Sequence, residues 1–330
     1  MTGVDEGAVD LVRLIRGERL ESVHRGHAVI CDGRGEMVEA WGDPAALIYP
    51  RSACKMVQAL PLVESGAGRD LTERQLAFAC ASHQGAAIHR EMAAAWLADL
   101  GLAEADLRCG PQEPDDRPER DRLIRAHAEP CQLHNNCSGK HCGFLTLGRH
   151  LGAGPEYTEI DHPVQRAVRA AFDETCEFQS PAWGVDGCSA PNFTTRLDAL
   201  GRAMGRFAAA RADGDARARA MVRLRRAMGA APELVAGERR ACTDLMRAMS
   251  GEVAVKTGAE GVFVAIIPAL ERGIALKICD GGTRAAEATI ATLLIRLGVL
   301  AAEAPVARTL THGPIRSRRG LEAGRIEMAI

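Results

Sequence analysis

The sequence is poor in aromatic residues and has no feature of an exported or membrane-bound protein. Aromatic residues make up 4% of the 330 positions, so the core must be built mostly from Ala, Leu, Val and Ile. No apolar run is long enough to span a bilayer, and residues 1–10 are acidic and lack the apolar stretch of a signal peptide. The net charge of −2 gives no reason to expect nucleic acid or membrane as a partner. We therefore expect a cytoplasmic globular protein.

Cysteine pairs with the spacing C-x-x-C are also lacking, although the chain contains eleven cysteines. An odd number without regular spacing is not a disulfide framework, and the missing C-x-x-C argues against zinc ribbons and thioredoxin-like redox sites. In a reducing compartment such cysteines are buried thiols or metal ligands.

Strand patterns lie at both ends of the chain, and helix patterns fill its middle. Residues 8–42 and 252–280 have the alternation and turn signals of strands, whereas residues 52–250 are mainly helical. No repeat or linker divides the chain. We predict one α+β domain over residues 1–330, with an antiparallel sheet of N- and C-terminal strands and helices flanking it.

Local signals place several helix ends within this plan. Thr72 and Gln75 have the spacing of a capping box, and Asp161 is expected to cap a later helix. Pro61 should interrupt the helix that follows residue 52. A final helix is expected from Gly282 to about Leu300.

The first candidate site is Arg51-Ser52-Ala53-Cys54-Lys55, at an expected helix start. A Ser and a Lys three positions apart lie on one helix face. A lysine amine with a pKa lowered by burial can take the proton of a serine hydroxyl. The helix dipole also favours negative charge that develops near Ser52.

Two later stretches extend this pair to a three-part pattern. Ser82-His83-Gln84 stands where penicillin-binding enzymes carry S-D-N, and Lys256-Thr257-Gly258 is a literal K-T-G. The three stretches follow the chain order of penicillin-recognising serine hydrolases. We expect Lys256 on a sheet strand facing the Ser52 helix, although alone it could be an edge-strand lysine that deters aggregation.

Five stretches together resemble the Rhizobium etli type of bacterial L-asparaginase, over about residues 20–300. They are Arg-Ser-Ala-Cys-Lys (51–55), Ser-His-Gln-Gly (82–85), Asn-Asn-Cys-Ser-Gly-Lys-His (135–141), Val-Asp-Gly-Cys-Ser-Ala-Pro (185–191) and Lys-Thr-Gly-Ala-Glu-Gly-Val (256–262). The resemblance implies a β-lactamase-like, penicillin-recognising fold and a homodimer. It also implies hydrolysis of L-asparagine to L-aspartate and ammonia.

The resemblance further implies two Ser–Lys pairs, Ser52 with Lys55 and Ser82 with Lys256. As a hypothesis, Ser52 attacks the side-chain carbonyl and neutral Lys55 takes its proton. Ser82 and Lys256 relay that proton to the departing ammonia. Backbone N–H groups of Ser52 and of strand 256–260 stabilise the oxyanion. Spacing alone leaves open which serine attacks, and we favour Ser52 because it stands at the helix start.

The resemblance also implies a zinc ion that is held by Cys137, Lys140 and Cys188, with water completing its coordination shell. A lysine ligand must lose its proton, which is uncommon. From the residues alone, His134 or His141 would be the better third ligand, and two buried thiols without a metal are the plain alternative.

Three more residues match family positions near the substrate or the metal: Arg51, Asp186 and His141. Asp186 would bind the α-ammonium group of the substrate, and Arg51 its α-carboxylate. The plain alternatives are a turn residue and a solvent-exposed charge. His83, His89 and His150 are expected to be structural.

Two other functions remain open from the sequence. The same fold could serve a glutaminase or another amidase or β-lactam-type serine hydrolase, because one methylene separates Asn from Gln. Alternatively, the cysteine cluster could belong to a non-catalytic zinc- or redox-sensing protein.

Overall fold

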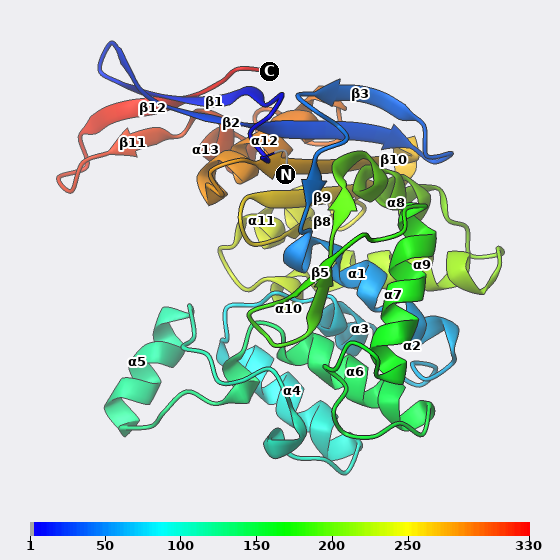
Figure 1. Cartoon of the computed structure of the whole chain (residues 1–330). Helices are drawn as coiled ribbons and strands as arrows, with labels where there is room; N and C mark the ends of the chain where they lie inside the picture. The colour runs from blue at the N-terminus through cyan, green and yellow to red at the C-terminus, as the bar shows by residue number, and fades with distance from the viewer. Residues whose placement is uncertain (1–2) are drawn as a thin grey trace. The chain divides into compact units, whose positions relative to one another are not determined.

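The computed structural model describes residues 3–330, which divide into two compact units (Figure 1). The first unit comprises the chain up to Ala53, together with Thr195–Ala209 and Asp244–Ile330. The second comprises Cys54–Thr194 and Ala210–Thr243.

The first unit is built on an antiparallel sheet that joins the two ends of the chain. Its order is β11-β12-β1-β2-β10-β9-β8, and β3 pairs with β2. Figure 1 shows the blue N-terminal strands beside the red C-terminal ones. The predicted sheet of N- and C-terminal strands is confirmed. Its strands are β1 (Val9–Arg16), β2 (Arg19–Asp32), β3 (Met37–Trp41), β8 (Ala254–Thr257), β9 (Val262–Ile267), β10 (Arg272–Ile278), β11 (Pro314–Arg316) and β12 (Glu322–Met328).

Helices cover the central strands of this sheet. Every residue of β9 is buried, and so are all residues of β10 after Arg272. Because neighbouring side chains on a strand point to opposite faces, both faces of these strands are covered. Helices α8 (Leu197–Ala209) and α12 (Thr283–Arg296) both pack on them. The unit also contains η1 (Arg51–Cys54), η4 (Pro268–Leu270), α13 (Pro305–His312) and the short pair β4 (Leu47–Ile48) and β7 (Thr195–Arg196).

Glycines let α8 approach the sheet backbone directly. A Cβ on Gly205 would lie 2.2 Å from the carbonyl oxygen of Asp32, and one on Gly273 would lie 2.1 Å from the Gly205 nitrogen. No side chain fits at either position, so glycine is needed for this close packing.

The second unit is mostly helical, and α6 lies at its centre. This helix packs against α2, α3, α4 and α7 and is buried over most of its length. The unit's helices are α1 (Lys55–Gln58), α2 (Leu60–Glu64), α3 (Glu73–Ala79), α4 (Ala87–Asp99), η2 (Glu104–Asp106), α5 (Arg117–Ala126), η3 (Gln132–His134), α6 (Ser138–His150), α7 (Pro163–Cys176), α9 (Ala216–Ala230) and α10 (Pro232–Val235). A hairpin of β5 (Trp183–Val185) and β6 (Pro191–Phe193) completes it, and α11 (Ala241–Ala248) begins in this unit and ends in the other.

Several predicted helix ends are confirmed and others are corrected. The capping box at Thr72 and Gln75 is present. The helix after residue 52 is interrupted between α1 and α2, and Pro61 is the second residue of α2. The helix expected to begin at Asp161 starts instead at Pro163, because the ring of His162 accepts the hydrogen bond from the Val164 N–H. Segment 51–54 is a 3₁₀ turn ahead of α1.

The C-terminal region extends further than the sequence pattern predicted. The final helix was expected to reach about Leu300, but α12 ends at Arg296. It is followed by α13 and by the β11–β12 hairpin, which adds two strands to the sheet.

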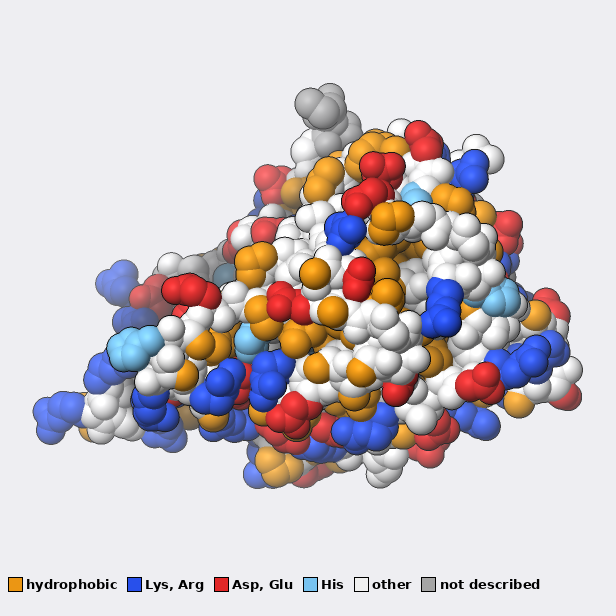
Figure 2. Space-filling model, turned by 90° about the horizontal axis from the view of Figure 1, so that it is seen from below, with side chains coloured by type: hydrophobic (Ala, Val, Ile, Leu, Met, Phe, Trp, Pro, Cys, Tyr) orange, Lys and Arg blue, Asp and Glu red, His pale blue; other side chains and the backbone are white. Residues whose placement is uncertain are grey.

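No helix among residues 3–330 combines the length and the apolar character that crossing a bilayer requires. On the face displayed in Figure 2, acidic and basic side chains are interspersed.

Candidate functional site

In the first unit, the turn carrying Ser52 lies against the end of strand β8. A Cβ added to Gly258 would lie 2.7 Å from the Pro50 carbonyl oxygen and 3.0 Å from the Ala53 nitrogen. The K-T-G stretch and the Ser52 turn are therefore in direct backbone contact. Ser52 is buried, with 8% of its surface exposed. It follows Arg51, whose φ of 51° lies in the left-handed region that non-glycine residues seldom adopt.

Lys256 stands on β8, opposite Val264 of β9. Strand β8 is an edge strand of the sheet, as the edge-strand interpretation required. However, the Lys256 side chain is 1% exposed, and its Nζ donates to the carbonyl of Thr257 at 2.7 Å. A lysine that deters edge-to-edge aggregation must face solvent, so burial argues against that interpretation.

In the second unit, the start of α1 and the loop after α3 come together. The Lys55 side chain is 1% exposed, and its Nζ donates to the carbonyl oxygens of Ala81 and Asn136. Ser82 follows Ala81, and its backbone N–H donates to Val235 at 2.8 Å. Lys55 therefore lies beside the loop that carries Ser82 and beside the residue that precedes Cys137.

His83 links the Ser82 loop to the start of α6. The Gly85 N–H donates to its Nδ1 at 3.1 Å, so the proton is on Nε2, which donates to Ser138 Oγ at 3.0 Å. Its ring stacks with those of Phe78 and His89, at centroid distances of 5.1 and 4.4 Å, and the Phe78 and His89 rings lie 6.3 Å from one another. No periodic pattern in the sequence predicts this stack.

Two cysteines and an aspartate from separate segments form a cluster. Cys137 occupies the N-cap position of α6, and Cys188 and Asp186 lie in the β5–β6 loop. One ligand atom from each of the three lies within 4.8 Å of the others. The Nζ of Lys140 donates to Cys188 Sγ at 3.1 Å. Both cysteines and Lys140 are buried, and Asp186 is half-buried.

Close backbone packing places Lys140 in this cluster. A Cβ on Gly139 would lie 2.0 Å from the Phe78 carbonyl oxygen, so the first turn of α6 rests directly on the end of α3. On the opposite side, Ser189 has a φ of 68° and donates its N–H to the Asp186 carbonyl at 2.8 Å, which closes the β5–β6 loop.

The charges of the cluster are coupled. A hydrogen bond from Cys137 and the charge of Lys140 hold the pKa of Cys188 well below its ordinary value, against the effect of burial. The same hydrogen bond and burial raise the pKa of Cys137. Burial alone would lower the pKa of Lys140, but the negative charge of Cys188 and Cys137 raises it. Without a metal, these shifts favour a thiolate at Cys188, a thiol at Cys137 and an ammonium group at Lys140.

These donors fit a zinc ion. Two sulfurs and a carboxylate oxygen are usual zinc ligands, and the amine nitrogen of Lys140 would be an uncommon fourth. The Asp186 carboxylate, which we had expected to bind the substrate ammonium group, also lies beside the two cysteine sulfurs. A divalent cation would displace the protons of Cys137 and Lys140.

His141 follows Lys140 and is fully buried. Tyr157 accepts the Arg108 N–H at 2.7 Å, and its hydroxyl lies 2.9 Å from His141 Nδ1. If the hydroxyl donates to Nδ1, the proton of the neutral ring is on Nε2. Within residues 3–330, Nε2 has no hydrogen-bond partner. Burial, followed by the charge of Lys140, lowers the pKa of His141 well below 6.5.

The other histidine considered as a third ligand lies elsewhere. The ring nitrogens of His134 contact Cys131 and Glu119, so this ring has other partners than the Cys137–Cys188 cluster. Arg51, Ser52 and Lys256 thus belong to the first unit, and Lys55, Ser82, Cys137, Lys140, His141, Asp186 and Cys188 to the second.

Comparison with known proteins identifies the family. The family model for L-asparaginase II matches residues 12–328, so the chain belongs to the L-asparaginase II family. The chain is accordingly an asparaginase, an amidohydrolase whose small-molecule substrate is asparagine. This confirms the resemblance seen in the five sequence stretches.

Similar solved structures are much more distant. A protein provisionally assigned as a β-lactamase from Bacteroides dorei shares 10% identity at a TM-score of 0.42, covering 82% of this chain and 93% of its own. A β-lactamase from Mycobacterium bovis shares 11% identity at a TM-score of 0.38, covering 82% of this chain and 94% of its own. No curated protein sequence matches the chain.

Proposed function

We propose that the chain hydrolyses the side-chain amide of L-asparagine with Ser52 as nucleophile and Lys55 as its base. Burial of Lys55 beside the Ser82 loop is the observation that carries this proposal. A buried amine surrounded by carbonyl oxygens is held in one orientation, which a general base needs. The left-handed backbone at Arg51 supports the choice of Ser52, because strained residues often adjoin reacting groups.

The reaction then proceeds in two stages. Ser52 Oγ attacks the side-chain carbonyl carbon while Lys55 takes its proton, and the C–N bond breaks as the leaving nitrogen is protonated through Ser82 and Lys256. Water next hydrolyses the ester to release aspartate. Backbone N–H groups of Ser52 and of segment 256–260 stabilise the oxyanion in both stages.

We also propose that Cys137, Lys140 and Cys188 hold Zn²⁺, with the Asp186 carboxylate near enough to join them. A bound zinc ion would supply positive charge that steadies the substrate and shapes the pocket, since the nucleophile is a serine. His141 offers a neutral N–H to a substrate acceptor, and Arg51 a guanidinium group to the α-carboxylate. The metal and the substrate ammonium group are competing partners for Asp186.

Serine substitutions test the mechanism. Ammonia release from asparagine should fall by about 10³-fold or more in Ser52→Ala and substantially in Ser82→Ala. It should be unchanged in Ser65→Ala, an exposed serine at the end of α2. Full turnover in Ser52→Ala would show that this serine is not the nucleophile, and full turnover in both site variants would refute the Ser–Lys mechanism.

The same assay with glutamine measures substrate choice. A pocket discriminates a single methylene by only about 10–200-fold, so a measurable glutaminase activity is expected. The resemblance also leads us to propose a homodimer in the cytoplasm, for which sedimentation of the purified protein and cell fractionation are the tests.

A further inference from the structure

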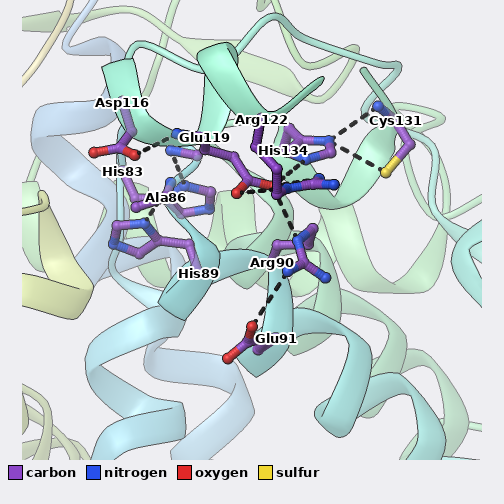
Figure 3. A network of polar contacts seen from close by, with 11 residues as sticks. His83, Ala86, His89, Arg90, Glu91, Asp116, Glu119, Arg122, Cys131 and His134 are labelled. Carbon is purple, nitrogen blue, oxygen red and sulfur yellow. Dashed lines mark hydrogen bonds and ion pairs between the residues drawn. The ribbon is translucent and has the colours of Figure 1, made fainter. Parts of the chain in front are cut away.

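Outside the site described above, three residues of the second unit form a chain of contacts (Figure 3). Cys131 Sγ lies 3.3 Å from Nδ1 of His134, and Nε2 of His134 lies 3.2 Å from Oε1 of Glu119. Figure 3 shows the His134 ring between the sulfur and the carboxylate. A thiol, an imidazole and a carboxylate in this order are the components of an activated nucleophile.

The hydrogen bonds fix which nitrogen of His134 carries the proton. The backbone N–H of Cys131 donates to Nδ1 at 3.0 Å, so Nδ1 presents its lone pair. Nε2 therefore carries the proton and donates it to Glu119. This lone pair accepts the backbone N–H of Cys131 at 3.0 Å and also lies 3.3 Å from the thiol, so taking the thiol proton requires the backbone hydrogen bond to be given up.

The carboxylate of Glu119 is held by two arginines and remains ionised. Glu119 is 3% exposed and also binds Arg122 at 2.7 Å and Arg90 at 3.1 Å. The hydrogen bond from Arg122 is the main cause that lowers the pKa of Glu119 to about 2. Of the charged groups near the Cys131 thiol, Glu104 raises its pKa and Arg90 lowers it.

The Cys131 thiol is more accessible to reagents than most of the other thiols. Of the eleven cysteines, only Cys131 and Cys279 are partly exposed, and the rest are buried. Burial raises the pKa of both thiols, so neither is a thiolate at rest. The Cys279 thiol has further partners, because its sulfur donates to the Val4 carbonyl at 3.2 Å and a hydrogen bond with Asp5 also raises its pKa.

Cys279 is a built-in control, because its histidine has the opposite arrangement. His27 Nε2 lies 3.9 Å from the Cys279 sulfur. The Asp43 N–H donates to His27 Nδ1 at 2.8 Å, so Nε2 carries the proton and donates it to the Val4 carbonyl. The nitrogen nearest to Cys279 therefore has no lone pair with which to take the thiol proton.

We propose that Cys131 is an activated thiol and a covalent modification site for small electrophiles, hydroperoxides in particular. In the reaction with hydrogen peroxide, the thiol proton passes to His134 Nδ1 and the sulfur attacks one peroxide oxygen. The S–O bond forms as the O–O bond breaks, and the departing hydroxide takes the proton from His134 to become water. The sulfur is oxidised by two electrons to a sulfenic acid, and the peroxide is reduced.

The primary test compares two thiols in the same folded full-length chain. Iodoacetamide forms an S–C bond and releases iodide, and mass spectrometry of the digested protein gives the alkylation rate at each cysteine. At pH 7.5, Cys131 should react at least about tenfold faster than Cys279, because base assistance typically contributes 10²–10⁴-fold. Equal or slower alkylation of Cys131 would refute the proposal without requiring any variant.

Variants then identify the cause. His134→Gln should lower the Cys131 rate to that of Cys279, and Glu119→Gln should lower it several-fold. His127→Gln, an exposed histidine at the end of α5, should leave the rate unchanged. A Cys131 rate that is unaffected by His134→Gln in a protein with wild-type thermal unfolding would mean that His134 only caps the η3 turn.

A second experiment, with hydrogen peroxide, tests whether hydroperoxides are the class of electrophile that reacts with Cys131. After brief treatment with hydrogen peroxide, dimedone should label Cys131 ahead of Cys279, and His134→Gln should abolish that preference. Absence of dimedone label at Cys131, with iodoacetamide still selective, would overturn the assignment of hydroperoxides as the class of electrophile.

Discussion

The side-chain nitrogen of Lys140 lies 3.1 Å from the sulfur of Cys188, and both groups are buried. In the metal-free cluster this contact is a hydrogen bond from Lys140 to Cys188, and the pKa shifts of the two groups favour an ammonium group and a thiolate. With a zinc ion in place, the same two atoms would become neighbouring ligands. Metal binding would displace the protons of Lys140 and Cys137, so metal content decides between the two states.

Zinc content should therefore depend on Cys188 and not on every buried thiol. Cys188→Ala removes a thiolate ligand and should reduce zinc in the purified protein from about one equivalent to a small fraction, because structural zinc affinity depends on each ligand. Elemental analysis after dialysis measures this content. Cys142→Ala is the matched control, because Cys142 lies on α6 and its sulfur faces Ala93 instead of the cluster. Wild-type protein without zinc, or equal zinc in both variants, would contradict the metal proposal.

Gly258→Ala should disturb the Ser52 turn through the backbone. The new methyl group would meet the Pro50 carbonyl and the Ala53 nitrogen at 2.7 and 3.0 Å, and neither atom can move without shifting the turn. Overpacking of this kind costs about 1–3 kcal/mol. Because a shift of the nucleophile also misaligns it, ammonia release should fall by about 10²-fold, measured beside chemical unfolding.

Gly154→Ala provides the control for this substitution. No atom lies within 4 Å of a Cβ at Gly154, and its backbone is not in the left-handed region. This variant should keep wild-type stability and activity. If Gly258→Ala behaves in the same way, the contact between the K-T-G strand and the Ser52 turn does not position the nucleophile.

Local sequence patterns predicted the features that depend on neighbouring residues. The Thr72 capping box and the break near Pro61 follow from spacing along one segment. The sheet followed from strands at both ends of the chain, although the β11–β12 hairpin has a weak alternation and was missed.

Features that depend on distant contacts could not be predicted in this way. The stack of Phe78, His83 and His89 forms because α3 and α4 meet, which no period within either helix specifies. The contact of His134 with Glu119 joins residues fifteen positions apart across a loop. Neither a hydrophobic period nor a short motif encodes such an arrangement.

The His89 ring makes stability depend on pH between its unfolded and folded pKa values. The Ala86 N–H donates to Nδ1, and Nε2 donates to the Glu233 carbonyl at 2.9 Å, so the neutral ring satisfies both contacts. Burial lowers its pKa from 6.5 to about 4. Below pH 6.5 the unfolded chain binds a proton that the folded chain excludes. Stability therefore falls as the pH drops from 6.5 to 4, by about 3 kcal/mol from this residue alone.

Replacement of His89 should remove this part of the pH dependence. His89→Gln lacks the titrating group, so its stability should be lower than that of the wild type at pH 7 but should fall less steeply towards pH 4.5. Urea unfolding at both pH values measures the two slopes, and carboxylates that titrate in this range contribute equally to both proteins. His150→Gln, at an exposed position at the end of α6, should keep the wild-type slope. Identical slopes for wild type and His89→Gln would mean that the folded protein accepts a proton on His89 without cost, which the two hydrogen bonds of the neutral ring oppose.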